Sequence, residues 1–258
     1  MIKKIYGKHT FYFTILTIIL SLIGLSIGNN FNIINEIIIS FFCLFLILSI
    51  GISHGALDNY KANKLLSIYK IKSKSIFFGI YISISALVIL IWSLYSSSAL
   101  LAFLIVASYH FGREDTSFLH EGNAHIDQVF YLIKGSIIIF SPLFFQFDNT
   151  LKIFETLMLS KNFIIFIKEE HWLINVCLFL SILGYFYFIF KNKLQDFEIL
   201  LLDMLSIIIL NYIFSPLIAF TIYFCFLHSI RHIISISYEL NKIDFSKGVK
   251  TFVRKALP

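Results

Sequence analysis

Three ionisable side chains interrupt an apolar run near the end of the chain. The segment FCFLHSIRHIISIS, residues 224–237, carries His228, Arg231 and His232 among residues suited to a lipid environment. His228 and His232 are four residues apart, so on a helix their side chains stack on one face, one turn apart. That spacing lets two imidazoles bind a single metal ion, as in other H-x-x-x-H helices.

Two further histidines each precede an acidic residue by four positions. His54 precedes Asp58 in GISHGALDNYK, and His110 precedes Glu114 in ASYHFGRED. Because an imidazole that binds a metal usually donates its other N–H to a carboxylate, both pairs fit a metal ligand and the acidic residue that orients it. For His110 we expect that acidic residue to be Glu114 or its neighbour Asp115.

These residues together predict an imidazole-rich metal site. Imidazole suits iron, copper or zinc, and the H-E-x-x-H motif of zinc hydrolases does not occur in the sequence. Imidazole ligands with open positions favour iron and oxygen chemistry on a substrate taken from the lipid. The other histidines fall in predicted loops or interfaces, where we expect them to be solvated: His9, His120, His125 and His171.

The composition assigns these residues to a membrane protein. Of 258 residues, 58% are hydrophobic and 14% are charged, whereas soluble domains carry roughly 25% charged residues. The apolar runs predict an all-α, polytopic transmembrane bundle that forms one integral membrane domain over residues 1–258. About eight spans are expected, at residues 11–27, 35–55, 75–95, 99–117, 126–145, 172–190, 197–214 and 215–237. Residues 150–168 are too polar to span and are expected at the interface.

The distribution of lysine and arginine sets the orientation, because positively charged loops stay in the cytoplasm. With the N-terminus inside, seventeen of these residues fall in inner segments and three in outer ones. Both termini are therefore expected in the cytoplasm, in a multi-pass protein of the cell's inner membrane. The net charge of +6 then belongs to the cytoplasmic rim and indicates no nucleic-acid partner. The same orientation brings four histidines from three spans to the inner half of the membrane: His54, His110, His228 and His232.

Two further ionisable residues lie deep within the predicted spans. Lys134 and Asp203 are at similar depth, and we expect them to form an ion pair that holds two helices together. Arg231 is expected to face the cytoplasmic headgroups or an acidic partner. The cysteines are odd in number and far apart, so we expect packing residues and no disulfide: Cys43, Cys177 and Cys225.

The motifs GISHGALD (51–58), YHFGRED (109–115) and HSIRH (228–232) resemble those of the Brp/Blh family of membrane β-carotene 15,15′-dioxygenases. With the layout of the spans, the resemblance covers essentially the whole chain. It implies an Fe(2+)- and O2-dependent enzyme that splits the central double bond of β-carotene into two all-trans retinals, which typically supply a microbial rhodopsin. Carried onto this sequence, it assigns iron binding to four residues: His54, His110, His228 and His232.

The length of the substrate adds a geometric expectation. β-Carotene is about as long as the ~30 Å hydrocarbon core of a bilayer, so an upright molecule would hold its central bond at the midplane, away from an inner-leaflet iron. We therefore expect the polyene to lie tilted or flat and to enter sideways between helices. Aromatic residues near the histidines are candidates for its lining: Tyr109, Phe111, Tyr223, Phe224 and Phe226.

Two other classes of protein remain open. Another membrane lipid oxygenase, of the desaturase or hydroxylase kind, would carry several clustered histidine boxes, whereas this chain has a single H-x-x-x-H. A haem-binding protein would place histidines on facing helices, on both sides of the macrocycle. A transporter would show helices broken by glycine or proline at mid-membrane, and the chain has only three prolines.

Overall fold

The structure is a computed structural model, and it describes residues 1–27, 33–51, 62–63, 66–70, 74–119, 125–192, 194 and 196–256. Across these residues the regular secondary structure is helical, which confirms the expected all-α class. The helices are α1 (Ile2–Ile27), α2 (Ile33–Gly51), α4 (Lys74–Leu94), α5 (Ser96–Glu114), α6 (His125–Gly135), α7 (Ile137–Phe145), α8 (Phe147–Thr156), α9 (Lys161–Glu169), α10 (His171–Lys191), α11 (Phe197–Ile213), α12 (Pro216–Ile222), the π-helix η2 (Tyr223–His228), α13 (Ser229–Leu240) and α14 (Phe245–Ala256).

Five stretches of the described chain are long and apolar enough to cross a membrane: Ile2–Ser26, Ser75–Leu94, His125–Phe145, His171–Lys191 and Pro216–Leu240. The other three predicted spans coincide with α2, α5 and α11. The expectation of a membrane protein is thus confirmed. The number of eight spans stays a prediction. Residues 150–168 form most of α8 and α9, of ten and nine residues. At 1.5 Å per residue each is about 15 Å long, too short to cross the bilayer.

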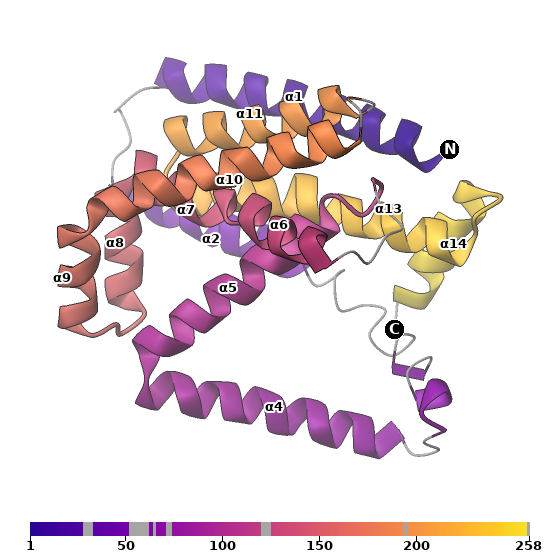
Figure 1. Cartoon of the computed structure of the whole chain (residues 1–258), viewed down its shortest axis with the longest axis horizontal. Coiled ribbons are helices and arrows are strands. Elements are labelled where there is room, and N and C mark those ends of the chain that lie inside the picture. Colours follow the sequence, from indigo (N-terminus) through magenta and orange to yellow (C-terminus); the bar gives the residue numbers. More distant parts are fainter. Residues whose placement is uncertain are drawn as a thin grey trace.

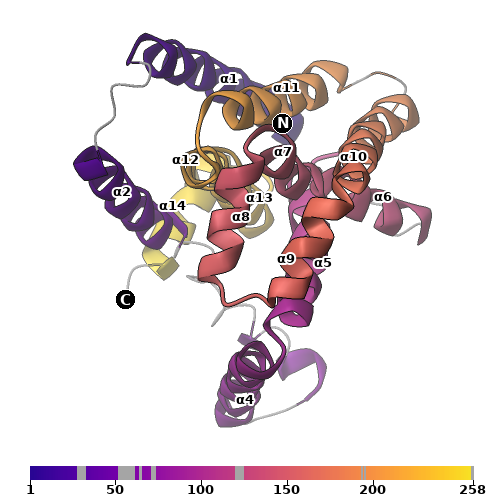
Figure 2. The ribbon, with the colours of Figure 1, turned by 90° about the vertical axis from the view of Figure 1, so that its left-hand side faces the viewer.

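The helices pack around a core formed by α7, α11 and the α12–η2–α13 segment. Figure 1 shows α1, α10 and α11 lying side by side, and α1 packs along α11 while α10 packs against α6 and α7. α5 runs diagonally to these helices and crosses α6. α4 lies apart from the bundle in both views and packs against α5 (Figures 1 and 2).

Contacts between distant segments agree with the predicted sides of the membrane. Lys3 at the start of α1 donates to Asp196 in the α10–α11 connection, with 2.8 Å between Nζ and Oδ2, and both segments were predicted on the inner side. Ser96 at the start of α5 donates to the carbonyl of Met158 between α8 and α9, and both were predicted on the outer side. In Figure 1 the two chain ends lie at one end of the bundle and α9 at the other. Which end faces the cytoplasm stays a prediction.

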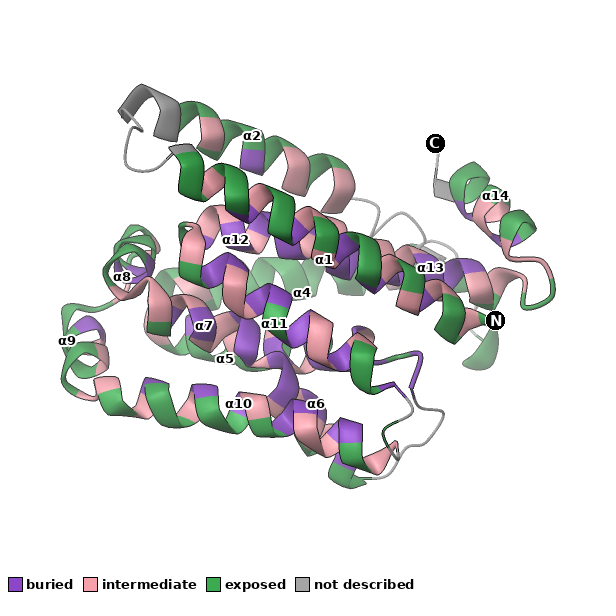
Figure 3. Ribbon diagram, turned by 90° about the horizontal axis from the view of Figure 1, so that it is seen from above, coloured by how far each residue is buried: buried purple, intermediate pink, exposed green. Residues whose placement is uncertain are grey.

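Large apolar side chains face outward over much of the surface. Phe11 is 57% exposed on α1, Phe41 is 69% exposed on α2 and Ile89 is 70% exposed on α4. Soluble proteins rarely expose contiguous apolar surface of this extent, so these faces are suited to lipid. Figure 3 shows the complementary pattern, with buried residues gathered where α7, α11, α12 and α13 face one another.

Small residues bring α5 and α6 into backbone contact. A Cβ at Gly112 would overlap the carbonyl oxygen of Tyr131, and a Cβ at Gly135 would overlap that of Ser108. Close approach through small residues is the usual means of packing helices in membranes, where lipid removes the hydrophobic driving force between them. The contact fixes the C-terminal turn of α5, which carries the acidic residues that follow Gly112.

A proline determines where the last predicted span begins. Ser215 is extended, with φ −59° and ψ 155°, and Pro216 is at the N-terminus of α12. The residue before a proline avoids the helical region, and proline is favoured in the first helical turn. The predicted boundary between residues 214 and 215 is confirmed, because α11 ends at Ile213 and α12 begins at Pro216.

Candidate active site

The H-x-x-x-H segment follows a local change in helical hydrogen bonding. In the π-helix η2, the backbone N–H of Ser229 donates to the carbonyl of Phe224, five residues earlier. π-turns are rare and occur frequently at functional sites. α13 begins directly after η2, so His228 and His232 lie one turn apart at the junction of the two helices. His228 is fully buried and His232 is 5% exposed.

Each of these histidines is held by a carboxylate from the end of α5. The Nδ1 of His228 is 2.9 Å from Oδ1 of Asp115, and the Nδ1 of His232 is 2.8 Å from Oε1 of Glu114. The sequence reasoning paired these acids with His110 on the same helix. In the structure they form hydrogen bonds to the histidines of α13 instead, because the C-terminal turn of α5 lies against that helix.

These hydrogen bonds define which ring nitrogen carries the proton. An ionised carboxylate only accepts hydrogen bonds, so each Nδ1 must donate. In a neutral imidazole the lone pair then lies on Nε2, which is the arrangement of a metal-binding histidine. The two imidazoles therefore fit a metal ligand set in both donor type and tautomer.

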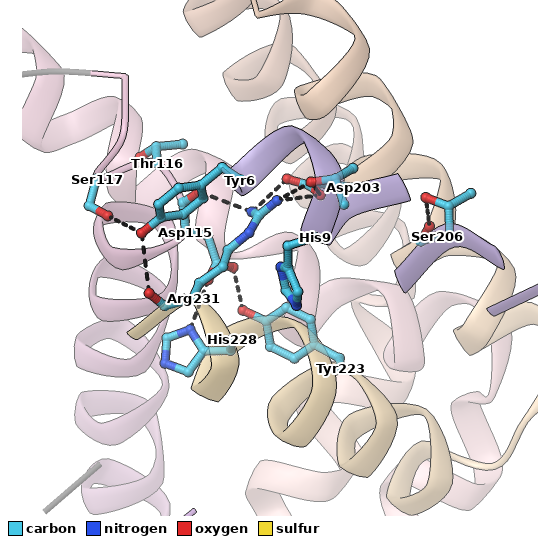
Figure 4. A network of polar contacts seen from close by, with 12 residues as sticks. Tyr6, His9, Asp115, Thr116, Ser117, Asp203, Ser206, Tyr223, His228 and Arg231 are labelled. Atoms are coloured by element: carbon cyan, nitrogen blue, oxygen red, sulfur yellow. Dashed lines mark hydrogen bonds and ion pairs between the residues drawn. The ribbon is translucent and has the colours of Figure 1, made fainter. Parts of the chain in front are cut away.

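Asp115 also receives a tyrosine hydroxyl. Tyr223 donates to Oδ2 of Asp115 over 2.6 Å, while His228 occupies Oδ1 (Figure 4). Asp115 is 2% exposed and Tyr223 is equally buried. Each carboxylate oxygen thus has a donor, which fixes the plane of the carboxylate and, through it, the His228 ring.

Arg231 points into the core beside these groups and is 0% exposed. Its Nη1 and Nη2 each donate to one oxygen of Asp203 on α11, both over 2.7 Å. Nη1 also donates to the backbone carbonyl of Asp115, and Nη2 to the hydroxyl of Thr10. The expected acidic partner is confirmed. The alternative, that Arg231 faces the headgroups, is wrong, because the bidentate pair holds it inside the bundle (Figure 4).

The expected ion pair between Lys134 and Asp203 is wrong for the same reason. Both carboxylate oxygens of Asp203 accept hydrogen bonds from Arg231. Among the described residues no ion pair joins Asp203 to Lys134. Lys134 is 1% exposed, and its Nζ lies 4.6 Å from the centre of the Tyr185 ring. A cation over an aromatic face is attracted by the quadrupole of the ring, so α6 is linked to α10.

Of the other two predicted metal ligands, the structure describes only His110. The His110 ring centre is 5.2 Å from that of His228, at an angle of 73°. His54 and Asp58 lie outside the described residues. The end of α2 reaches the site, because a Cβ at Gly51 would lie 2.7 Å from Cε1 of Phe224. Within the described residues, no group of three or more histidine, cysteine or acidic side chains is placed to hold a metal.

Aromatic rings surround His228. Phe111 lies 4.8 Å from it at 90°, Phe224 lies 5.8 Å away and Tyr223 6.0 Å away, measured between ring centres. Three of the five predicted aromatic residues are thus beside a predicted ligand. Tyr109 turns away and donates to Gln128 on α6.

The remaining histidines differ in their surroundings. Nε2 of His9 is 2.9 Å from the carbonyl of Phe226 in η2, so the expectation that His9 is solvated is wrong. His171 packs edge-on against Phe147, with 4.5 Å between ring centres. His125 is exposed at the start of α6, as expected, and His120 lies outside the described residues.

Sequence reasoning missed the contribution of α1. The Tyr6 hydroxyl donates to the backbone carbonyl of Arg231 over 3.2 Å (Figure 4). Thr10 accepts a hydrogen bond from the guanidinium of Arg231. A signal was present in the sequence, since small polar residues and one tyrosine recur at helical spacing along one face of an apolar helix: Tyr6, Thr10, Thr14, Thr17 and Ser21.

The fold and the site together define an all-helical membrane protein with buried, carboxylate-held histidines in its interior. The family model of β-carotene 15,15′-dioxygenase matches residues 45–258. The chain therefore belongs to the β-carotene 15,15′-dioxygenase family, whose members are carotenoid-cleaving dioxygenases.

A similar protein is the β-carotene 15,15′-dioxygenase of uncultured marine bacterium 66A03. It is 26% identical over 216 residues, which cover 81% of this chain and 74% of that protein. No solved structure matches the chain. The family match excludes the desaturase, haem-protein and transporter alternatives.

Proposed function

We propose that this protein cleaves the central double bond of β-carotene with O2 and Fe(2+), and that the iron is held by His54, His110, His228 and His232. One β-carotene and one O2 give two all-trans retinals, which balances all atoms. When bound, ferrous iron supplies the reactivity toward O2 at the substrate's double bond, and the protein needs no separate nucleophile.

The two carboxylate–imidazole hydrogen bonds support this proposal most directly. Asp115 and Glu114 hold His228 and His232 with the proton on Nδ1, which leaves each Nε2 lone pair for the metal. The acids are consecutive and the histidines are one helical turn apart, so a single contact between two helices orients both ligands. Asp58, which follows His54 by four residues in the sequence, stays the acid proposed to orient that histidine.

The end of α2 makes His54 an acceptable fourth ligand. Gly51 touches Phe224, whose ring lies 5.8 Å from that of His228. His54 follows Gly51 by three residues in the sequence. His110, beside His228, provides the remaining imidazole from α5.

The buried network around Arg231 provides the rigidity that such a site needs. Arg231 joins α13 to α11 through Asp203, and to α5 through the carbonyl of Asp115. All these groups are almost fully buried, so water does not compete for their hydrogen bonds. Ligands that are held by packed and hydrogen-bonded neighbours keep the geometry that catalysis requires.

The topology suits a substrate and a product that dissolve in lipid. We propose eight spans in the cell's inner membrane, with both termini in the cytoplasm and β-carotene reaching the site from the bilayer. The retinal that is released is then available to a retinal-binding membrane protein such as a microbial rhodopsin.

Expression in bacteria that accumulate β-carotene tests the proposal. Cells with the wild-type chain should lose their colour and accumulate retinal, whereas cells with His228→Ala should stay coloured. His125→Ala is the matched control, because His125 is exposed at the start of α6, and it should bleach cells like the wild type. A folded, iron-loaded wild-type protein that leaves β-carotene intact would contradict the proposal.

A further inference from the structure

The π-helix η2 sets how α13 is rotated relative to α12. The N–H of Ser229 donates to the carbonyl of Phe224, five residues earlier, whereas an α-helix bonds to the fourth residue. The extra residue turns the helix that follows by about one position, which is about 100° in an α-helix. Because α12 packs against α2 and α11, the π-turn lets it keep that packing while His232 on α13 faces Glu114.

The return from π- to α-helical bonding requires a donor from outside the helix. Where the spacing shortens from five residues to four, one carbonyl of the turn is left without an N–H of its own helix, and buried carbonyls need a donor. His9 of α1 points toward the segment that carries Tyr223 and His228 (Figure 4). Its Nε2 is 2.9 Å from the carbonyl oxygen of Phe226 in η2. Since a carbonyl only accepts, Nε2 carries the proton and donates.

This donated hydrogen bond is the contact that fixes the His9 ring. Its other nitrogen, Nδ1, is buried and has no hydrogen-bond partner among the described residues. Tyr6, one turn earlier on α1, donates to the carbonyl of Arg231 over 3.2 Å. α1 therefore supplies donors to the backbone on both sides of His228, at Phe226 before it and at Arg231 after it.

The helix that supplies these donors precedes the part of the chain that the family model matches. The match begins at residue 45, whereas α1 covers Ile2–Ile27. The three histidine motifs also lie after α1 in the sequence. The contact between His9 and Phe226 therefore adds a residue to the site that neither the motifs nor the matched region contains.

We propose that His9 is a positioning residue for the iron ligands, which acts by holding the π-turn that aims His228 and His232. This inference rests on the proposed function for its effect on iron. His9 itself contacts neither metal nor substrate. Without its donor, the π-turn contains an unpaired buried carbonyl, so an α-bonded turn becomes the more stable alternative. In that turn α13 is rotated, and His232 no longer faces Glu114.

Three variants separate this role from a general contribution of α1 to stability. His9→Leu removes the donor and keeps an apolar side chain in its place. His9→Gln retains an N–H at a similar reach and should restore most of the wild-type behaviour. Thr14→Val is the matched control, because it removes the hydrogen bond of 3.3 Å between Thr14 on α1 and Ser206 on α11, which does not involve η2.

Hydrogen exchange of the metal-free, full-length protein in detergent tests the π-turn without iron. Mass spectrometry of peptides covering residues 222–232 reports how often this backbone opens. His9→Leu should exchange roughly five- to 100-fold faster there than the wild type, the effect of leaving a buried carbonyl without its donor. His9→Gln and Thr14→Val should stay within about threefold of the wild type.

The loaded enzyme tests the effect on the ligands. His9→Leu should lower ferrous iron affinity and kcat by a factor in the same range, with KM for β-carotene within about twofold of the wild type. The inference is overturned if His9→Leu leaves exchange at residues 222–232 unchanged, if Thr14→Val has an equal effect, or if His9→Gln fails to rescue. A wild-type protein that forms no retinal overturns the proposed function instead, and the exchange of the metal-free protein still decides whether His9 holds the π-turn.

Discussion

Replacing Asp115 with asparagine tests how the carboxylates at the end of α5 act. The carboxylate is 2% exposed and accepts from His228 over 2.9 Å and from Tyr223 over 2.6 Å. Asparagine has nearly the same shape but only one acceptor oxygen, so its NH2 group must face one of these two donors. If the NH2 faces His228, the proton of the ring moves to Nε2 and the lone pair for the metal is lost. If it faces Tyr223, the charged acceptor of His228 becomes a neutral one.

The expected loss follows from these two arrangements. A hydrogen bond to a charged group contributes about 1.5–3 kcal/mol and a neutral one about 0.5–1.5 kcal/mol. The difference of about 1–1.5 kcal/mol corresponds to about five- to tenfold in binding, and a changed tautomer adds to it. Loss of a group that orients a metal ligand typically lowers affinity or activity about 10–100-fold. We expect Asp115→Asn to fall in that range.

The assay measures ferrous iron affinity and the rate of retinal formation on purified protein. Tyr223→Phe is the matched control, because it removes one donor to Asp115 and leaves the His228 hydrogen bond in place. It should lower both quantities less than about fivefold. A folded Asp115→Asn protein that binds iron and forms retinal within twofold of the wild type would refute the orienting role of Asp115.

The remaining predictions concern stability, measured as the midpoint of thermal unfolding in detergent. Asp203→Asn should destabilise by about 3–5 kcal/mol because it leaves the buried Arg231 unpaired, and a double replacement of both by apolar residues should recover most of that loss. Lys134→Met should lower the free energy of unfolding by less than about 2 kcal/mol, since only a ring contact is lost. A loss as large as that of Asp203→Asn would instead indicate a direct ion pair between Lys134 and Asp203. Gly112→Ala should lower the midpoint because its Cβ overlaps the backbone of α6, whereas Gly79→Ala should not, having open space around it. Equal midpoints for the two glycine variants would contradict the close crossing of α5 and α6.

The sequence predicted the helices well because their causes are local. Apolar length and flanking lysines depend on neighbouring residues, so six of the eight predicted spans each coincide with one helix, and the other two coincide with α6–α7 and with α12–η2–α13. Pro216 marked a boundary for a local reason too, since proline restricts the residue before it. The start of α1 was misjudged: the helix begins at Ile2, and Lys3 reaches from it to Asp196.

The pairing of charged residues could not be predicted, because it depends on how helices rotate and cross. An i,i+4 rule links His110 to Glu114 within α5, yet the carboxylate bonds to His232 on α13. Similar depth links Lys134 to Asp203, yet Arg231 takes both carboxylate oxygens. Sequence spacing describes one helix at a time, whereas these contacts join two.

The π-helix was likewise invisible in the sequence. Nothing in the sequence YFCFLH distinguishes this segment from an α-helical one. The backbone carbonyl of Phe226 in this segment forms a hydrogen bond with His9, which lies near the other end of the chain. A cavity lined by Phe111 and Tyr223 has its other walls on α5, α7, α8, α11 and α12, and no local pattern in the sequence describes how these helices pack. What the sequence did indicate was chemistry: histidines placed where burial is costly proved to be held by acids, as the tautomer of a metal ligand requires.

The central claim is that these histidines hold an iron that the cleavage of β-carotene requires. The most direct measurement depletes the purified protein of metal with a chelator, then adds ferrous iron and β-carotene under air or under nitrogen and quantifies retinal. The account predicts two retinals per β-carotene consumed, formed only with iron and air, and no iron binding or retinal in His228→Ala. Retinal formed at an unchanged rate without iron, or under nitrogen, would contradict it.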